Sequence, residues 1–448
     1  MVHMSFVRLL IIFIVLFLSV AAAHPQNRKP DLILRNVAVI DVRTGRSRPG
    51  RDVVIRNGKI ASITRAGSAT AGRDAQILDL SGKYLIPGLI DSHYHLVPSH
   101  WPPAVAAARR RFAFMNGVTT VRDMAGDAID IKALADQAVD PDTELPRIYF
   151  SAFMAGPQWF NDRRAAEMSH GMTPGTAPWA RMIDDKTDIR KAVADAKATG
   201  AVALKLYERL TADQVKALTA EAHRQGMKVW SHAAVFPAGP SDVVDAGVDS
   251  ISHSDGLIYA AVTPVWEEYR ELNWKNVKPD APQVVALLKE MRRKGVVLDA
   301  TLHIYDENVE YDLEEKPENQ NKWYVDQQEW AYQVTRLAHQ LGVTIVAGTD
   351  YPERPRRRNG VANIHFEMEL LTKKAGMTAA EALRAATLNG ARLLGVDRLY
   401  GSIEPGKIAD LVVIDGDPLA DIRNTRRVAY IIKGGVPHKS EAVKMPDQ

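Results

Sequence analysis

Eight short apolar runs, most of them followed by a stretch with helical periodicity, constrain the fold of this chain more than any other feature. The runs cover residues 85–93, 118–124, 147–152, 202–207, 228–233, 250–254, 296–303 and 344–350. Helical patterns occupy residues 104–116, 187–199, 211–225, 281–294, 325–341 and 378–394. Buried strands that alternate with helices are typical of repeated βα units. Eight such units predict an α/β fold of the (β/α)8 TIM-barrel class, with reactive side chains at the carboxyl ends of the strands.

Both ends of the chain differ from this central region because they alternate short β-rich runs with glycine-containing turns. Residues 31–84 and residues 401–437 share this texture, which is typical of antiparallel strands. We expect the two ends to complete one small β-sandwich subdomain. The predicted division is a signal peptide at 1–23, the first half of the sandwich at 24–84, the barrel at 85–395 and the second half of the sandwich at 396–448.

The amino-terminal residues have the three parts of an export signal. Arg8 supplies positive charge, an apolar stretch covers residues 9–20, and the alanines at 21–23 offer a small-residue cleavage site. The apolar stretch is short for a bilayer span, and no later segment is continuously apolar for long enough. We therefore expect an exported protein, periplasmic or secreted, with no stable membrane span after the signal is cleaved.

Composition narrows the possible chemistry and the possible partners. With 57 basic and 54 acidic residues, the net charge of +3 indicates neither a nucleic acid nor an anionic membrane as partner. The chain has no cysteine, which excludes disulfides and thiolate metal ligands. Any metal must therefore be held by histidine, carboxylate or a modified lysine. The oligomeric state stays open, and a homo-oligomer is one possibility.

Two histidines end the first predicted strand, in the segment Leu85-Ile-Pro-Gly-Leu-Ile-Asp-Ser-His-Tyr-His95. Side chains alternate between the faces of a strand, so His93 and His95 point the same way and Tyr94 points the other way. Two imidazoles at the end of a buried strand suit a borderline-soft metal ion such as zinc. For this motif alone a chance His-x-His pair is the alternative, because the chain has 13 histidines.

Later predicted strands also end in polar side chains that are able to bind a metal. In chain order these are Lys205, His232, His253 and Asp350. Each has a structural explanation when taken singly, such as a satisfied core histidine, a paired lysine or an N-capping aspartate. Together they fall at the same end of the predicted barrel, and this favours a metal centre.

Several longer motifs extend this pattern. They are Pro87-Gly-Leu-Ile-Asp-Ser-His-Tyr-His95, Gly348-Thr-Asp350, Ala379-Ala-Glu-Ala-Leu-Arg-Ala-Ala-Thr-Leu-Asn389 and Gly401-Ser-Ile-Glu-Pro-Gly-Lys-Ile-Ala-Asp-Leu-Val-Val413. On these motifs the chain resembles the metal-dependent amidohydrolase superfamily, in particular its imidazolonepropionase-like and prolidase-like (Xaa-Pro dipeptidase-like) branch. The resemblance covers essentially everything after the signal segment. It implies a barrel that carries a β-sandwich formed by both chain ends.

The resemblance also implies a binuclear centre with two divalent ions, Zn2+ first among them. The implied ligands are His93, His95 and Asp350 for the more buried ion, His232 and His253 for the second, and Lys205 as a bridging carbamate. A buried lysine near metal charge has a lowered pKa, and its neutral amine can combine with carbon dioxide to give an anionic bidentate ligand. Two metals lower the pKa of a bridging water and polarise a carbonyl. Asp350 would take the proton and pass it to the leaving nitrogen.

Other candidates have weaker support. Tyr207 shares the face of Lys205 and is a candidate to stabilise an oxyanion or orient the substrate, although packing at the barrel rim explains it equally well. His303 ends the seventh predicted strand and is a substrate contact or a loop histidine. Arg354, in the loop after the eighth strand, would grip a substrate carboxylate or belong to a solvated loop. Arg122 and Asp123 are expected to form an ion pair with each other.

Loops are expected to cover the barrel mouth at residues 155–186, 255–280 and 303–328. The favoured function is a metal-dependent amidohydrolase that cleaves a C–N bond in a small peptide-like or N-acyl amino-acid substrate. A mononuclear cyclic-amide hydrolase or deaminase, similar to imidazolonepropionase, is the enzymatic alternative. A non-catalytic binding protein is a further alternative, because barrels of this kind persist after losing metal ligands. The complete set of implied ligands argues against it.

Overall fold

The computed structural model describes residues 31–70, 72–96, 101–263, 272–315, 322–350 and 360–444. The predicted signal segment 1–23 lies outside these residues, as does Arg354. Within the described part of the chain, no helix combines the length and the apolar character needed to cross a bilayer.

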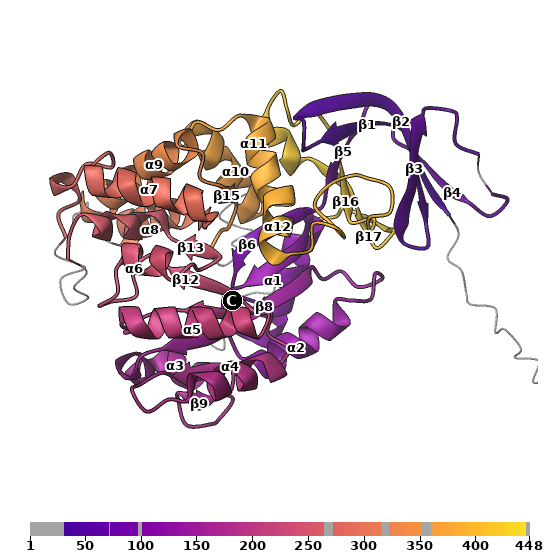
Figure 1. The fold of residues 1–448 in the computed structure, drawn as a ribbon. Helices are drawn as coiled ribbons and strands as arrows, with labels where there is room; N and C mark the ends of the chain where they lie inside the picture. Colours follow the sequence, from indigo (N-terminus) through magenta and orange to yellow (C-terminus); the bar gives the residue numbers. More distant parts are fainter. Residues whose placement is uncertain are drawn as a thin grey trace, which may run out of the picture.

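Eight parallel strands form the barrel that the sequence predicts (Figure 1). In barrel order they are β6 (Leu89–Tyr94), β7 (Val118–Asp123), β8 (Arg147–Ala155), β11 (Ala203–Leu206), β12 (Lys228–His232), β13 (Ser250–Ser252), β14 (Val297–Asp299) and β15 (Ile345–Val346). The ring closes where Ser92 N donates to Ala347 O at 2.8 Å and Asp350 N donates to His93 O at 2.9 Å. The first and last strand ends are therefore neighbours.

Helices surround this barrel (Figure 1). They are α1 (Pro103–Met115), α2 (Ala128–Gln137), α4 (Ile189–Ala198), α5 (Ala212–Arg224), α6 (Pro240–Asp245), α7 (Pro282–Lys294), α8 (Leu302–Glu315), α9 (Lys322–Gln340), α10 (Asn363–Lys373), α11 (Ala379–Arg384), the π-helical η5 (Ala385–Asn389) and α12 (Gly390–Leu394). Local signals set their ends. Thr211 and Gln214 form a capping box at the start of α5, and Gly295 ends α7 with φ of 74°.

Both chain ends contribute to a second sheet beside the barrel (Figure 1). Its strands are β1 (Leu32–Asp41), β2 (Arg46–Arg56), β3 (Lys59–Arg65), β4 (Gln76–Asp79), β5 (Tyr84–Pro87), β16 (Leu411–Ile414), β17 (Val428–Lys433) and β18 (Val436–Lys439). The two ends meet where β16 pairs antiparallel with β5. Because β6 begins two residues after β5, this pairing places the small β subdomain directly at the entry to the barrel.

The segments expected to be loops contain more regular structure than predicted. After β8 come η1 (Pro157–Asn161), α3 (Arg163–Glu167), β9 (Thr176–Ala177) and β10 (Ala180–Met182), and after β13 come η2 (Ser254–Ala260) and η4 (Trp274–Asn276). The expectation of a loop at 303–328 is wrong, because α8 occupies its first half and α9 begins at Lys322. The buried face of α8 includes the polar residues His303 and Glu307. Its apolar periodicity is therefore weak.

Candidate metal centre

All six predicted ligands lie at the carboxyl ends of barrel strands. His93 is within β6 and His95 follows it, Lys205 is within β11, and His232 is the last residue of β12. His253 follows β13, and Asp350 lies beyond β15. The barrel therefore brings together residues separated by more than 250 positions in the chain, as in the pair His95 and Asp350.

His93, His95 and Asp350 form the tightest group. Asp350 Oδ1 lies 3.1 Å from Nε2 of His93 and 3.1 Å from Nε2 of His95. The ligand atoms of the three residues all lie within 4.8 Å of one another. Two imidazole nitrogens and a carboxylate oxygen are a donor set that zinc accepts. These residues therefore fit a metal ion without rearrangement of the backbone.

His253 and His232 lie next to this group. His253 Nε2 lies 3.7 Å from Asp350 Oδ2. The ring centroids of His93 and His253 are 4.9 Å apart, and those of His253 and His232 are also 4.9 Å apart. The imidazoles thus form a continuous row across the barrel mouth, in which a second ion would find two further nitrogen ligands.

Lys205 lies under this row, and its side chain is almost fully enclosed. The residue is 1% exposed, and Nζ lies 3.5 Å from Ser252 Oγ. Burial lowers the pKa of Lys205 to about 7, because the charged ammonium loses its hydration. Asp299 and Asp350 raise that pKa and Arg122 lowers it further. A buried amine that is half neutral near pH 7 meets the first requirement for carbamate formation.

The protonation states of the other ligands also favour metal binding. Burial lowers the pKa of His253 to about 4 and that of His232 well below its ordinary value. Burial raises the pKa of the Asp350 carboxyl, but His93 and His253 bring it well below its usual range. His232 and His253 are therefore neutral and Asp350 is ionised, which are the forms that bind cations. At His95 burial lowers the pKa, but the contact with Asp350 raises it above the ordinary value.

The buried ion pair of Asp299 and Arg122 contacts the candidate ligands from the barrel interior. Asp299 Oδ2 accepts from His93 Nδ1 at 2.7 Å, from Arg122 Nη2 at 2.7 Å and from Ser252 Oγ at 3.0 Å. Asp299 and Arg122 are both fully buried. A carboxylate on Nδ1 fixes the ring and its tautomer, so that Nε2 is available to a metal.

This arrangement corrects the expected pairing of Arg122 with Asp123. Consecutive strand residues point to opposite faces, so Arg122 enters the barrel interior and Asp123 lies on the other side of β7. There Asp123 accepts from Leu96 N at 2.8 Å and from Ala125 N at 3.1 Å. Sequence reasoning missed Asp299, although an aspartate in the apolar run Val296–Asp299 was a detectable signal.

The backbone around the ligands is unusually tight. A Cβ atom at Gly348 would lie 2.2 Å from Oδ1 of Asp299 and 2.7 Å from Cβ of His93. His253 and Asp350 adopt positive φ values of 70° and 49°. Such conformations cost free energy in residues other than glycine and persist where the surroundings impose them. Here the backbone N–H of His253 donates to Asp299 O at 3.0 Å.

The three predicted substrate contacts have different outcomes. Tyr207 lies at the site, with its ring 4.1 Å from that of His232. His303 belongs to the first turn of α8, beyond the end of β14, so its assignment to a strand end is wrong. Its side chain is 1% exposed and stacks on Phe366, which favours a structural role over substrate contact. The prediction for Arg354 concerns a residue outside the described part of the chain.

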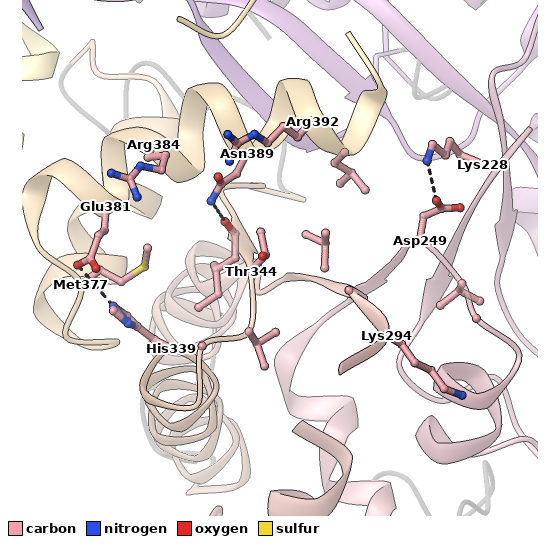
Figure 2. A pocket seen from close by; sticks show the side chains of 18 residues that line it. Lys228, Asp249, Lys294, His339, Thr344, Met377, Glu381, Arg384, Asn389 and Arg392 are labelled. Atoms are coloured by element: carbon pink, nitrogen blue, oxygen red, sulfur yellow. Dashed lines mark hydrogen bonds and ion pairs between the residues drawn. The ribbon is translucent and has the colours of Figure 1, made fainter. Parts of the chain in front are cut away.

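A pocket of about 580 Å3 lies at the opposite end of the barrel (Figure 2). It is lined by the first residues of three strands, Lys228 of β12, Val297 of β14 and Ile345 of β15. Its charged side chains are largely paired, as in the contact of Lys228 with Asp249 at 2.8 Å (Figure 2). The amino ends of barrel strands contribute to stability rather than to chemistry, so the size of this pocket does not make it the reactive site.

Comparison with known proteins identifies the family. The sequence profile of the Amidohydrolase family matches residues 84–437. The chain belongs to the amidohydrolase family. Membership makes it a hydrolase of carbon–nitrogen bonds, and the histidine and aspartate group described above agrees with the metal dependence typical of amidohydrolases.

Individual relatives of this amidohydrolase differ in what they act on. Ochratoxinase of Aspergillus niger is 26% identical over 414 residues, which cover 80% of this chain and 76% of ochratoxinase. An adenine deaminase of Ruegeria pomeroyi is 37% identical over 100 residues, and the match spans 22% of this chain and only 16% of the deaminase. A Xaa-Pro dipeptidase solved with bound methionine has the same fold, with a TM-score of 0.71, 22% identity, and coverage of 91% of this chain and 100% of the dipeptidase.

Proposed function

We propose that this amidohydrolase is exported and cleaves the C–N amide bond of a small peptide-like or N-acyl amino-acid substrate with two zinc ions. One observation carries the proposal. The barrel gathers four histidines, an ionised aspartate and a buried lysine at the carboxyl ends of its strands, with the imidazoles in a continuous row. This is the donor set of a binuclear hydrolase without thiolate ligands.

In this proposal the metals would be held by six residues from five strand ends. They are His93, His95 and Asp350 for one ion, His232 and His253 for the other, and Lys205, as a carbamate, between them. Bound zinc supplies a water of lowered pKa and polarises the substrate carbonyl. The enclosed position of Lys205 explains why the modification would persist, because its oxygens would be shielded from bulk water.

Asp350 is the proposed general base. Its carboxylate lies among His93, His95 and His253 and is ionised. An ionised oxygen at this place can take a proton from the attacking water and return it to the leaving nitrogen, which must be protonated before the C–N bond breaks. Asp350 adopts a positive φ, which costs free energy, and the surrounding structure holds the residue in this conformation.

Two relatives with different named substrates support the proposed class of amide substrates. Ochratoxinase aligns with four-fifths of this chain, and the solved Xaa-Pro dipeptidase aligns with nine-tenths of it. We extend amide cleavage from these relatives to this chain. Export to the periplasm or the medium belongs to the proposal and rests on the signal-like residues 1–23 of the sequence.

A mononuclear deaminase or cyclic-amide hydrolase is the second candidate. It is favoured by the observation that, of the four site histidines and Asp350, only His93, His95 and Asp350 meet within 4.8 Å, and by the partial match to an adenine deaminase. Such an enzyme would use the same aspartate and one metal, with Lys205 unmodified.

A substrate screen tests the proposal. Zinc-loaded, bicarbonate-treated protein is offered dipeptides, N-acyl amino acids, lactams and adenine, and the release of amine or ammonia is measured. We expect turnover of linear amides, and Asp350→Asn is the control that should retain zinc and lose turnover by about 100- to 10,000-fold. Release of ammonia from adenine alone would favour the second candidate. An active Asp350→Asn variant would contradict the role of this residue as base.

A further inference from the structure

We propose that Arg164 is a positioning residue that holds the hydroxyl of Tyr207 as a hydrogen-bond donor to the reacting amide. The inference rests on the proposed function, since it assigns a role within the same site. Arg164 belongs to α3, in the segment that follows β8, whereas Tyr207 comes directly after β11. The contact between them therefore joins two segments at the barrel mouth that are 43 positions apart in the chain.

The ring of Tyr207 is fixed in place beside the ligand row. Its centroid lies 4.1 Å from that of His232, 4.9 Å from that of Phe153 and 5.6 Å from that of Trp159. Packing on several sides leaves the aromatic ring little freedom. Only the direction of the hydroxyl hydrogen remains to be set.

Arg164 sets that direction. Its Nη1 lies 3.3 Å from Tyr207 Oη. A guanidinium has donors and no acceptor, so the phenol oxygen must accept in this contact and its own hydrogen must point elsewhere. Among the described residues the structure records no acceptor for this hydrogen. The hydroxyl can therefore donate to a group other than these described residues. We assign that group to the substrate, because an amide carbonyl oxygen gains negative charge when water attacks it.

The arginine, whose side chain is 52% exposed, is itself oriented by an ion pair with Asp162. Asp162 Oδ1 accepts from Arg164 Nε at 3.0 Å, and Asp162 Oδ2 accepts from Nη2 at 2.9 Å. Asp162 also caps α3 by accepting from Arg164 N at 2.8 Å. The two segments are tied together nearby, because Gly156 N donates to Glu208 O at 2.8 Å. A donor fixed before the reaction stabilises developing charge without reorganisation.

A double-mutant cycle on Arg164→Met and Tyr207→Phe tests the proposal, using the fastest amide of the screen. We expect Tyr207→Phe to lower kcat by about 100-fold and Arg164→Met by about 10-fold, with little change in KM. The double variant should be no slower than Tyr207→Phe alone, because Arg164 acts only through the hydroxyl that Tyr207→Phe removes. Arg164→Lys retains a donor and should restore most of the lost rate. The control is Arg163→Met, since this neighbouring side chain is 77% exposed and pairs with Glu167.

Calorimetric binding gives a second readout that does not depend on turnover. The probes are N-(methylphosphonyl) derivatives of L-phenylalanine, L-leucine and L-proline, whose tetrahedral oxygens imitate the charge that develops during hydrolysis. Arg164→Met and Tyr207→Phe should each bind the tightest probe more weakly than wild type and Arg163→Met do. The proposal is overturned if the two substitutions multiply in the double variant, because Arg164 would then act on the substrate itself. It is also overturned if the wild type is active and Arg164→Met has the same kcat and the same affinity for the probe. A wild type that neither binds these probes nor cleaves any amide would refute the proposed function first, and this inference with it.

Discussion

Replacement of Asp299 by asparagine tests whether the buried ion pair below the ligands supports both the fold and the metal centre. The substitution keeps the shape of the side chain and removes its charge. Asp299 accepts hydrogen bonds from His93, Arg122 and Ser252, and Arg122 is fully buried. Breaking a buried pair from one side leaves an uncompensated charge and costs about 3–5 kcal/mol of folding free energy. Loss of the carboxylate on His93 Nδ1 should weaken zinc binding by about 10- to 100-fold.

Two assays separate these effects. Urea denaturation of the metal-free protein measures the free energy of unfolding, and competition with a zinc chelator measures affinity. The matched control is Asp249→Asn at the other end of the barrel, where Asp249 pairs with the 43%-exposed Lys228 and the 42%-exposed His223. Asparagine keeps an oxygen that can still accept from Val229 N. A partly exposed pair contributes at most about 1 kcal/mol, and zinc affinity should not change. The role of the ion pair is contradicted if Asp299→Asn has the same free energy of unfolding and the same zinc affinity as wild type. It is also contradicted if Asp299→Asn and Asp249→Asn lose equal amounts of both.

Two further predictions concern Lys205 and Gly348. Burial lowers the pKa of Lys205 to about 7, so the amine is mostly charged below pH 7 and neutral above it. Because only the neutral amine combines with carbon dioxide, bicarbonate-dependent activation should increase as the pH rises through about 7, and equal activation at pH 6 and pH 8 would contradict the carbamate. Gly348→Ala should destabilise the protein by about 1–3 kcal/mol through overpacking against Asp299 and His93. Gly72→Ala, where an added Cβ meets nothing within 4 Å, should leave thermal unfolding unchanged.

The barrel was predictable because its strands are buried on both faces and therefore stand out as apolar runs. Each of the eight predicted runs overlaps a barrel strand, although β8 extends beyond its run to Ala155 and the run 344–350 yields only β15, Ile345–Val346. Beyond β15 the chain turns to bond with β6, and Thr349 N donates to the buried Asp91 carboxylate at 3.1 Å. Such tertiary contacts have no periodicity that a sequence reveals.

That the candidate ligands lie together was predictable for the same reason, since the carboxyl ends of the strands meet at one edge of the barrel. The buried ion pair of Arg122 and Asp299 was not predictable. Arg122 reaches across the barrel interior to Asp299, 177 positions later, and no local pattern selects that partner over the adjacent Asp123. Helix α8 was missed because polar residues, including His303 and Glu307, are buried on its inner face. In both cases the decisive interaction is a buried polar contact between distant segments.

The central claim, a carbamate-bridged binuclear site, is tested most directly by the zinc content of the purified protein. The measurement is zinc per chain by elemental analysis after loading in bicarbonate, for wild type and for Lys205→Ala. We expect two zinc ions per chain in wild type, and fewer in the variant because the bridging ligand is missing. One zinc per chain in both proteins would contradict the claim and favour a mononuclear site formed by His93, His95 and Asp350.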